Sequence, residues 1–290
     1  MDGHGTMQKD EKMIFTCPIC KEKLNKQEKT YACANGHSFD IAAEGYVHLL
    51  PPNKMHSKIP GDNKQMVASR RDFLAAGFYQ PFSDQLNELV RECLHAKVPV
   101  VLDAGCGEGY YTGRLYDDLK THGFSVEVYG FDISKFAVKA AAKRYRSINF
   151  AVGSSFDIPV GSNSADCVIN VFAPIVGEEL NRVLKPGGFL ILAVPGVRHL
   201  FGLKQILYDA PYENEYRETE YDGFLFQKRV AVQNQIVIDG NQTIMNLFAM
   251  TPYYWKTPVE GSERLRKTDT LSTQIEFDFL IYQKLERNEG

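Results

Sequence analysis

The chain has 290 residues, of which 44% are hydrophobic and 24% are charged, with a formal net charge of −3. This length favours one full-size domain with a small appended module, and the weakly acidic balance excludes a protein that coats nucleic acid through a bulk positive field. No apolar run is long enough for a signal sequence or a membrane span, so we expect a cytoplasmic protein.

The first feature along the chain is a cluster of cysteine and histidine residues near the N-terminus. The spacing C-x2-C-x12-C-x3-H joins Cys17, Cys20, Cys33 and His37. Two short ligand pairs separated by a loop are typical of a tetrahedral zinc site. Because side chains would fill all four positions, we expect a structural Zn2+ with no open site for water. The alternative is a set of buried core cysteines, which is our interpretation of the three isolated cysteines farther along.

A basic stretch follows between residues 54 and 71. Its only acidic residue is Asp62, against five basic residues: Lys54, Lys58, Lys64, Arg70 and Arg71. Such a run is either a solvated linker face or a surface that contacts phosphate groups. If the chain binds nucleic acid, we expect the contacts to be concentrated here and on the cysteine-rich module.

A strand, a glycine-rich turn and a helix come next. The β-branched run PVVLD enters the turn AGCGEG, and YYTGRLYDDL follows with helical spacing. Glycines at 105, 107 and 109 let the backbone approach a ligand closely and lead it to a helix N-terminus. Asp103 ends the strand, where a carboxylate can organise the turn and a bound ligand. Tyr110 stands where a dinucleotide fingerprint requires glycine, which disfavours nicotinamide chemistry.

The second strand, VEVYGFD, ends on Asp132. A carboxylate at this position of a doubly wound fold can accept hydrogen bonds from two ribose hydroxyls. The alternative is an N-cap for the following helical run KFAVKAAAKRY, a role for which Ser134 competes. We favour the ribose contact.

Strands and helices continue to alternate along the chain. FAVGSS, ADCVINVF and FLILAVP read as strands, and residues 81–94 read as an amphipathic helix before the first strand. RVAVQNQIVI and IEFDFLIYQKL read as late strands around a helical stretch. The pattern predicts an α/β, doubly wound, Rossmann-like sheet with a late antiparallel addition. Its ligand crevice would bring together Asp103, Asp132 and residues 170–174 at the carboxyl ends of the strands.

The order of these pieces resembles that of the bacterial 23S rRNA (guanine-N1-)-methyltransferases of the RlmA type. Beyond the cysteine cluster, the resemblance includes HSFDIAAEGYVHLLP, RRDFLAAGFYQPF, VLDAGCGEGYYT, FDISKFAVKAAAKRY, LNRVLKPGG, VPGVRHL and MTPYYW. The turn glycines alone would indicate only a class I methyltransferase, whereas this order of motifs is specific. It implies a zinc-binding module over residues 1–50, a basic linker and cofactor-capping segment over 51–80, and a methyltransferase domain over 81–290.

The resemblance also implies S-adenosylmethionine as methyl donor and one structural Zn2+ held by the cysteine and histidine cluster. It places cofactor contacts on Tyr79, Gly107, Glu108 and His199, beside the Asp103, Gly105 and Asp132 that the strand and turn pattern indicates. The expected partner is 23S rRNA or a ribosomal assembly intermediate. The residues leave the oligomeric state open, and the resemblance suggests a homodimer whose two zinc modules border one RNA cleft.

The predicted reaction moves a methyl group to N1 of a guanine in a 23S rRNA hairpin loop. The N1 edge is paired in a duplex, so the base must lie in a loop or be extruded into a pocket. The segment NVFAP after the fourth strand would form the pocket floor, with Phe172 for stacking and Pro174 for a rigid turn. No general base follows from the sequence, since Asp157 and Glu178 are merely nearby carboxylates.

Two other functions remain open from the residues alone. One is a zinc-bearing RNA-binding protein whose methyltransferase fold is inactive, against which the intact Asp103, Gly105, Gly107 and Asp132 argue. The other is a small-molecule methyltransferase with a structural zinc module, against which the basic stretch and the family resemblance argue.

Overall fold

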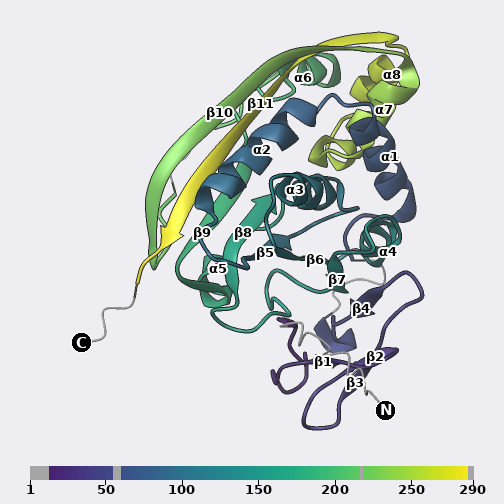
Figure 1. The fold of residues 1–290 in the computed structure, drawn as a ribbon. Coiled ribbons are helices and arrows are strands. Elements are labelled where there is room, and N and C mark those ends of the chain that lie inside the picture. Colours follow the sequence, from purple (N-terminus) through teal and green to yellow (C-terminus); the bar gives the residue numbers. More distant parts are fainter. Residues whose placement is uncertain (1–12, 55–59, 216–218, 287–290) are drawn as a thin grey trace, which may run out of the picture.

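The N-terminal module is a small three-stranded antiparallel sheet at one end of the molecule (Figure 1). The computed structural model describes residues 13–54, 60–215 and 219–286. The strands of the small sheet are β1 (Asn25–Lys26), β2 (Thr30–Ala32) and β3 (Ser38–Asp40), in that order. Its core is anchored by Phe15 and Leu24, which are fully buried.

The large sheet has eight strands in the order β10-β11-β9-β8-β5-β6-β7-β4. Their bounds are β4 (Tyr46–His48), β5 (Val100–Ala104), β6 (Glu127–Asp132), β7 (Asn149–Val152), β8 (Ala165–Val171), β9 (Leu184–Pro195), β10 (Phe224–Asp239) and β11 (Thr270–Lys284). Neighbouring strands from β4 to β9 pair in parallel, while β11 pairs antiparallel with both β9 and β10. The predicted doubly wound sheet with a late antiparallel addition is confirmed.

Strand β4 was not expected in this sheet. It comes from the segment that we assigned to the N-terminal module, yet it pairs in parallel with β7 from Tyr46 to His48. The buried Val47 in this strand packs into the same core as Phe15 and Leu24 of the module. The N-terminal module is thus joined to the catalytic sheet through backbone pairing and a shared core.

The helices are α1 (Lys64–Ala75), α2 (Gln80–Cys93), α3 (Tyr110–Thr121), α4 (Lys135–Arg144), α5 (Gly177–Val183), α6 (Phe201–Leu207), α7 (Asn241–Ala249) and α8 (Val259–Arg266), with short 3-10 turns η1 (Pro52–Lys54) and η2 (Pro252–Trp255). Helix α2 confirms the amphipathic helix predicted over residues 81–94. Helix α1 occupies part of the segment that we expected to be a linker. Within the described ranges, no helix has the length and apolarity needed to span a membrane.

The two faces of the sheet are covered differently. Successive strand side chains point to opposite faces, so Val101 of β5 packs in the core that most helices share, whereas Val100 and Leu102 pack on the other side. That second core contains Phe15 and Leu24 of the N-terminal module together with residues of α5. Figure 1 shows the same division, with α2, α3 and α4 on one side of the sheet and the module on the other. The module therefore covers part of one face of the sheet, as helices cover the other face.

Local side chains explain where α1 and α4 begin. The Asn63 side chain accepts hydrogen bonds from the backbone N–H groups of Gln65 and Met66, both at 3.0 Å. The Ser134 hydroxyl likewise accepts from the N–H of Ala137 at 3.2 Å. Both are typical N-cap contacts, which satisfy donors that have no partner within the helix.

Candidate functional site

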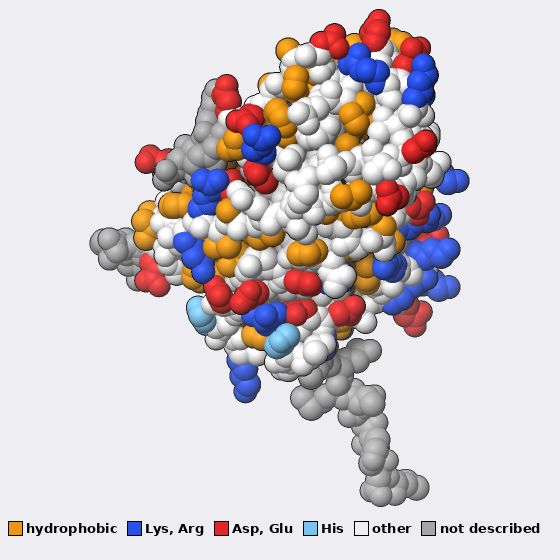
Figure 2. All heavy atoms as spheres, turned by 90° about the horizontal axis from the view of Figure 1, so that it is seen from above, with side chains coloured by type: hydrophobic (Ala, Val, Ile, Leu, Met, Phe, Trp, Pro, Cys, Tyr) orange, Lys and Arg blue, Asp and Glu red, His pale blue; other side chains and the backbone are white. Residues whose placement is uncertain are grey.

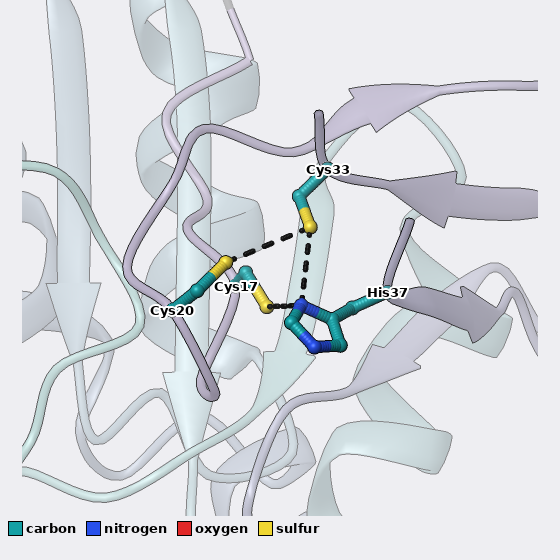
Figure 3. Close-up of side chains that lie close together, drawn as sticks. All are labelled: Cys17, Cys20, Cys33 and His37. Carbon is teal, nitrogen blue, oxygen red and sulfur yellow. Dashed lines mark hydrogen bonds between the residues drawn. The ribbon is translucent and has the colours of Figure 1, made fainter. Parts of the chain in front are cut away.

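The four predicted metal ligands lie together in the small module (Figure 3). Their ligand atoms all lie within 4.8 Å of one another. The Nδ1 atom of His37 is 3.6 Å from Sγ of Cys17 and 3.4 Å from Sγ of Cys33, and the Sγ atoms of Cys20 and Cys33 are 3.7 Å apart. These distances match the edges of a zinc tetrahedron, about 3.6 Å for sulfur to nitrogen and about 3.8 Å for sulfur to sulfur. The donor set and its geometry therefore fit Zn2+.

Each ligand pair is shaped by a tight backbone turn. The N–H of Lys21 donates to the carbonyl of Cys17 at 2.8 Å, and the N–H of Gly36 donates to that of Cys33 at 3.1 Å. Lys21 and Gly36 both have positive φ, at 65° and 82°, as such turns require. Hydrogen bonding from the backbone at Glu22 lowers the pKa of Cys20 to about 6, which favours the thiolate that a metal binds.

The three remaining cysteines are not metal ligands in this arrangement. Cys93, Cys106 and Cys167 are separate and buried, and burial raises the pKa of each thiol. They fit the core role that we assigned to isolated cysteines.

The glycine-rich turn between β5 and α3 leaves room at one position only. Gly105, Gly107 and Gly109 have φ values of 95°, 55° and 83°. A Cβ added at Gly105 would lie 2.2 Å from Cβ of Ala173, and one at Gly109 would lie 2.9 Å from Cβ of Ala141. At Gly107 nothing lies within 4 Å. The outer glycines are therefore needed for packing, while Gly107 presents bare backbone to open space.

Asp103 ends β5 with one carboxylate oxygen unpaired. The residue is 2% exposed, and its Oδ2 accepts a hydrogen bond from the Thr112 hydroxyl at 2.6 Å. Its Oδ1 is buried and has no hydrogen-bond partner in the part of the chain that the structure describes. Burial raises the pKa of Asp103 to about 7. A buried oxygen without a partner is costly, so this atom fits a cationic or hydrogen-donating ligand group.

Asp132, at the end of β6, is held by backbone groups. Its Oδ2 accepts from the N–H of Gly107 at 3.0 Å, and its Oδ1 accepts from the N–H of Ser134 at 2.7 Å. The helix cap of α4 is Ser134, so the N-cap alternative for Asp132 is not what the fold uses. Burial raises the pKa of Asp132. Since a carboxylate offers about four lone-pair sites, both oxygens can still accept hydroxyl donors.

A cleft of about 540 Å³ opens beside this turn, at the carboxyl ends of β8 and β9. Its lining comes from six parts of the chain, namely the segment from Asp62 into α1, the segment before α2, the end of β8 with the loop after it, the end of β9, the residues just before α6 and the region of η2: Asp62, Met66, Arg70, Tyr79, Asn170, Phe172, Ala173, Ile175, Ala193, Val194, Pro195, His199, Leu200, Met250, Thr251, Pro252, Tyr253 and Trp255. The cleft adjoins the glycine-rich turn because Ala173, in its wall, touches Gly105.

Tyr79 and His199, both expected to contact the cofactor, lie near each other in the lining of this cleft. Their ring centroids are 6.2 Å apart, and both rings pack against Phe277, at 5.0 Å and 4.6 Å. Burial, together with the charge of Lys204, lowers the pKa of His199 to about 3. The N–H of Glu276 donates to Nδ1 of His199 at 3.3 Å, so the neutral ring carries its proton on Nε2.

Of the two residues expected in the base pocket, Phe172 lines the cleft and Pro174 does not. Phe172 lines the cleft, is 42% exposed, and has φ of 56°, a strained conformation for a residue with a side chain. Pro174 is not part of the lining, but its carbonyl accepts a hydrogen bond from the Asn170 side chain at 3.3 Å. Pro174 thus shapes the loop through its backbone.

The carboxylates that we considered as bases lie away from the cleft. Neither Asp157 nor Glu178 lines it, and Asp157 is paired with Lys21 at 2.5 Å. Glu108 is 3% exposed within the turn, where burial raises its pKa, and it is also absent from the lining.

Sequence reasoning missed part of the cleft wall. Arg70 and Asp62 form an ion pair at 2.8 Å in the lining, although both were assigned to the basic stretch. The carbonyl of Asp62 also accepts from the Ser134 hydroxyl at 2.6 Å, which fixes α1 beside Asp132. The spacing of four between Met66 and Arg70 would have placed both on one face of a helix, had α1 been recognised.

The parallel sheet, the glycine-rich turn and its two carboxylates define a class I, S-adenosylmethionine-dependent methyltransferase. A family model described as a methyltransferase domain matches residues 96–248, and one described as the N-terminal zinc ribbon of RlmA matches residues 15–58. The chain belongs to the RlmA-type family of 23S rRNA (guanine-N1-)-methyltransferases. It uses S-adenosylmethionine and binds one structural zinc in its N-terminal ribbon.

Individual relatives agree with this assignment. The chain is 34% identical over 203 residues to the 23S rRNA (guanine(748)-N(1))-methyltransferase of Streptomyces fradiae, covering 69% of this chain and 70% of that protein. A relative from Micromonospora griseorubida is 35% identical over 205 residues, covering 64% and 67%. The protein YxjB of Bacillus subtilis (strain 168) is 28% identical over 282 residues, covering 93% and 97%.

Proposed function

We propose that the chain transfers the methyl group of S-adenosylmethionine to N1 of a guanine in a hairpin loop of 23S rRNA. The observation that carries this proposal is the aromatic cleft beside the glycine-rich turn. Phe172, Tyr79 and His199 line one cavity, and that cavity adjoins the turn through Ala173. A flat, uncharged base extruded from a loop fits a wall of aromatic rings.

We assign the cofactor contacts from the chemistry of the turn. The unpaired Oδ1 of Asp103 accepts the ammonium group of the methionine part, and the carboxylate of Asp132 accepts the ribose hydroxyls. Gly107 leaves the space along which the cofactor passes. By the family resemblance, Tyr79, Glu108 and His199 also contact the cofactor, and the burial of Glu108 suits a role that shapes the turn from within.

The protein residues contribute alignment and exclusion of water. The bound cofactor supplies a methyl group already activated by its sulfonium. Phe172, held in its strained conformation, presents a ring nearly parallel to that of His199, at 28° and 6.2 Å between centroids. Neutral His199 can donate from Nε2 without repelling the cationic sulfonium. Arg70, paired with Asp62, contributes to the cleft lining from α1. Fixing the base in line with the methyl group accounts for much of the acceleration that such sites provide.

Contacts to RNA phosphates are assigned to basic surfaces beside the cleft. In the basic stretch, Lys64 is exposed at the start of α1, whereas Arg70 is engaged with Asp62. The side chains of Lys54 and Lys58 lie outside the described residues. Helix α4 has no acidic residue and adds exposed Lys135, Lys143 and Arg144, whereas its Lys139 is paired with Glu44 at 3.0 Å. Figure 2 shows lysine and arginine side chains gathered at one edge of the molecule.

The charge assignment is tested by removing Lys54, Lys58 and Lys64 together. Each lost phosphate contact removes part of the counterion-release contribution, so the triple alanine variant should bind RNA more weakly and with a flatter salt dependence. Its affinity for S-adenosylmethionine should be unchanged. Identical RNA affinities and salt slopes for the variant and the wild type would assign this stretch to a solvated linker.

The reaction itself is tested with purified protein and cofactor labelled on the methyl group. Total rRNA from a strain lacking the gene and a panel of small-molecule acceptors are offered separately. We expect label in 23S rRNA, recovered after nuclease digestion as 1-methylguanosine. Label only in a small molecule would favour the metabolite alternative, and no transfer to any acceptor would favour an inactive RNA-binding protein.

Location and assembly are part of the same proposal. We place the chain in the cytoplasm, where it would act on 23S rRNA or on a ribosomal assembly intermediate as a homodimer. The support is the family resemblance. Light scattering on the purified protein measures its mass directly, and a monomer at working concentrations would remove the homodimer from the proposal.

A further inference from the structure

The rim of the cleft carries the only tryptophan of the chain. Trp255 ends η2, between α7 and α8, and 67% of it is exposed. A large aromatic ring that is mostly exposed at the rim of a cleft offers a free face on which a planar group can stack. Neither the glycine-rich turn nor the zinc ribbon involves this residue.

The ring follows a hydrogen-bonded turn. The carbonyl of Tyr253 accepts hydrogen bonds from the N–H groups of Lys256 and Thr257, at 3.0 and 2.9 Å, and from the Thr257 hydroxyl at 2.8 Å. The ring of Tyr254 meets that of Trp255 edge to face, with centroids 5.0 Å apart. Tyr254 in turn packs on Phe248 of α7 at 5.4 Å. Trp255 is therefore held by a hydrogen-bonded turn and by its ring contact with Tyr254.

Trp255 also lines a second hollow. This hollow, of about 480 Å³, lies between α1, α7 and α8, and its lining is mainly polar: Gln65, Ser69, Gln242, Met245, Asn246, Phe248, Ala249, Tyr254, Trp255, Ser262 and Arg266. Hydroxyls, amides and one guanidinium are the groups that proteins use to hold sugar and phosphate. Trp255 thus belongs to the lining of an aromatic cleft that suits a base and of a polar hollow that suits a nucleic-acid backbone.

We propose that Trp255 stacks on the nucleotide next to the target guanine, whose sugar and phosphate lie in the polar hollow. This inference rests on the proposed function, and it adds where the unpaired strand runs. Extruding one base leaves its neighbour without a stacking partner, and an aromatic ring can replace that partner for any base. Binding of this neighbour would hold the target at the mouth of the cleft and leave the cofactor site untouched.

Because Trp255 is the only tryptophan, the intrinsic tryptophan fluorescence of the wild type reports on this ring alone. Protein saturated with S-adenosylmethionine is titrated with a single-stranded heptaribonucleotide containing one central guanine. We expect quenching that saturates. A fully paired RNA duplex of the same sequence should quench much less, since its bases offer no free face.

Kinetics separate stacking from a structural role. Trp255→Ala should raise KM for 23S rRNA by about 5- to 150-fold, the range expected for one lost base stack, while the Kd for S-adenosylmethionine stays the same. Trp255→Phe should recover part of the loss, because it keeps an aromatic face. Val259→Ala is a matched control, since Val259 is also exposed, at 69%, but lines neither hollow.

The outcomes distinguish this inference from the proposed function. A wild type that methylates 23S rRNA, with no quenching and an unchanged KM in Trp255→Ala, would overturn the inference and leave the function intact. Saturable quenching without methyl transfer would retain the stacking site and overturn the proposed reaction. A wild type that shows neither quenching nor transfer would overturn both.

Discussion

The zinc ribbon and the cleft differ in how their residues are distributed along the chain. The ribbon takes four ligands from residues 17 to 37, on two short turns. The cleft takes its lining from segments spread between Asp62 and Trp255, which an eight-stranded sheet and its core bring together. A local site depends on the metal for its shape, whereas a site made from distant segments depends on the fold. Different substitutions should therefore disrupt the ribbon and the cleft.

The largest expected effect is loss of a zinc ligand. Cys33→Ser should reduce zinc from one per chain to nearly none, because structural zinc in such modules contributes on the order of 10 kcal/mol of apparent binding free energy. Metal analysis gives the stoichiometry, and limited proteolysis should cut the ribbon first. Cys93→Ala is the control, since that cysteine is buried away from the cluster. Full zinc content in Cys33→Ser would contradict the assigned ligand set.

The contact between the two regions should depend on packing. Phe15 is fully buried and meets the rings of Tyr129 and Tyr31 edge to face, at 5.3 and 6.5 Å. Phe15→Ala should lower the free energy of unfolding by about 3–5 kcal/mol through lost contacts and a cavity. Zinc content should be unchanged, because Phe15 is not a ligand. A denaturation midpoint equal to that of the wild type would mean that the ribbon is not docked through this residue.

At the glycine-rich turn beside the cleft, Asp132→Ala should weaken cofactor binding without unfolding the chain. Losing two charge-assisted hydrogen bonds to ribose costs on the order of 2–4 kcal/mol. Asp132 also holds the N–H groups of Gly107 and Ser134, so Asp132→Asn serves as a control of similar shape. Calorimetry with S-adenosylmethionine measures both variants. Wild-type affinity in Asp132→Ala would remove the ribose assignment.

A smaller effect should appear as pH dependence of cofactor binding. Burial raises the pKa of Asp103 to about 7, so the cofactor-free chain holds this carboxyl protonated below that pH. A bound ammonium favours the ionised form, and binding then releases a proton. Affinity should rise with pH up to about 7, by at most about tenfold per unit. Calorimetry between pH 5.5 and 7 checks this slope. A slope that persists in Asp103→Asn would assign it to another group.

The smallest expected effect concerns the ion pair between the two regions. Lys21 of the ribbon pairs with Asp157 of the catalytic domain, and the lysine side chain is 56% exposed. Such a surface pair contributes at most about 1 kcal/mol, so Lys21→Met should barely move the midpoint of thermal unfolding. A loss as large as that expected for Phe15→Ala would show that charge, and not packing, holds the ribbon in place.

The same contrast explains what could be predicted from the sequence. The ribbon was predictable because its ligands are close in the chain and the spacing itself encodes the chemistry. The positions of the glycine-rich turn and of Asp132 were predictable, because ligands of doubly wound sheets bind at the carboxyl ends of the strands. The Arg70 and Asp62 pair was not, because the apolar residues of α1 are spread around the helix and do not form the clear apolar face by which a helix is recognised. The pairing of β4 with β7 was also unpredictable, since three residues carry too little pattern to specify a partner.

The most direct test of the proposed function is primer extension on 23S rRNA from a strain lacking the gene. A methyl group on N1 of guanine blocks Watson–Crick pairing, so reverse transcriptase stops one nucleotide before it. We predict one stop in a hairpin loop that is absent from the deletion strain, returns with the wild-type gene, and does not return with Asp132→Ala. Identical stop patterns in the deletion and restored strains would contradict methyl transfer to guanine N1 of this RNA.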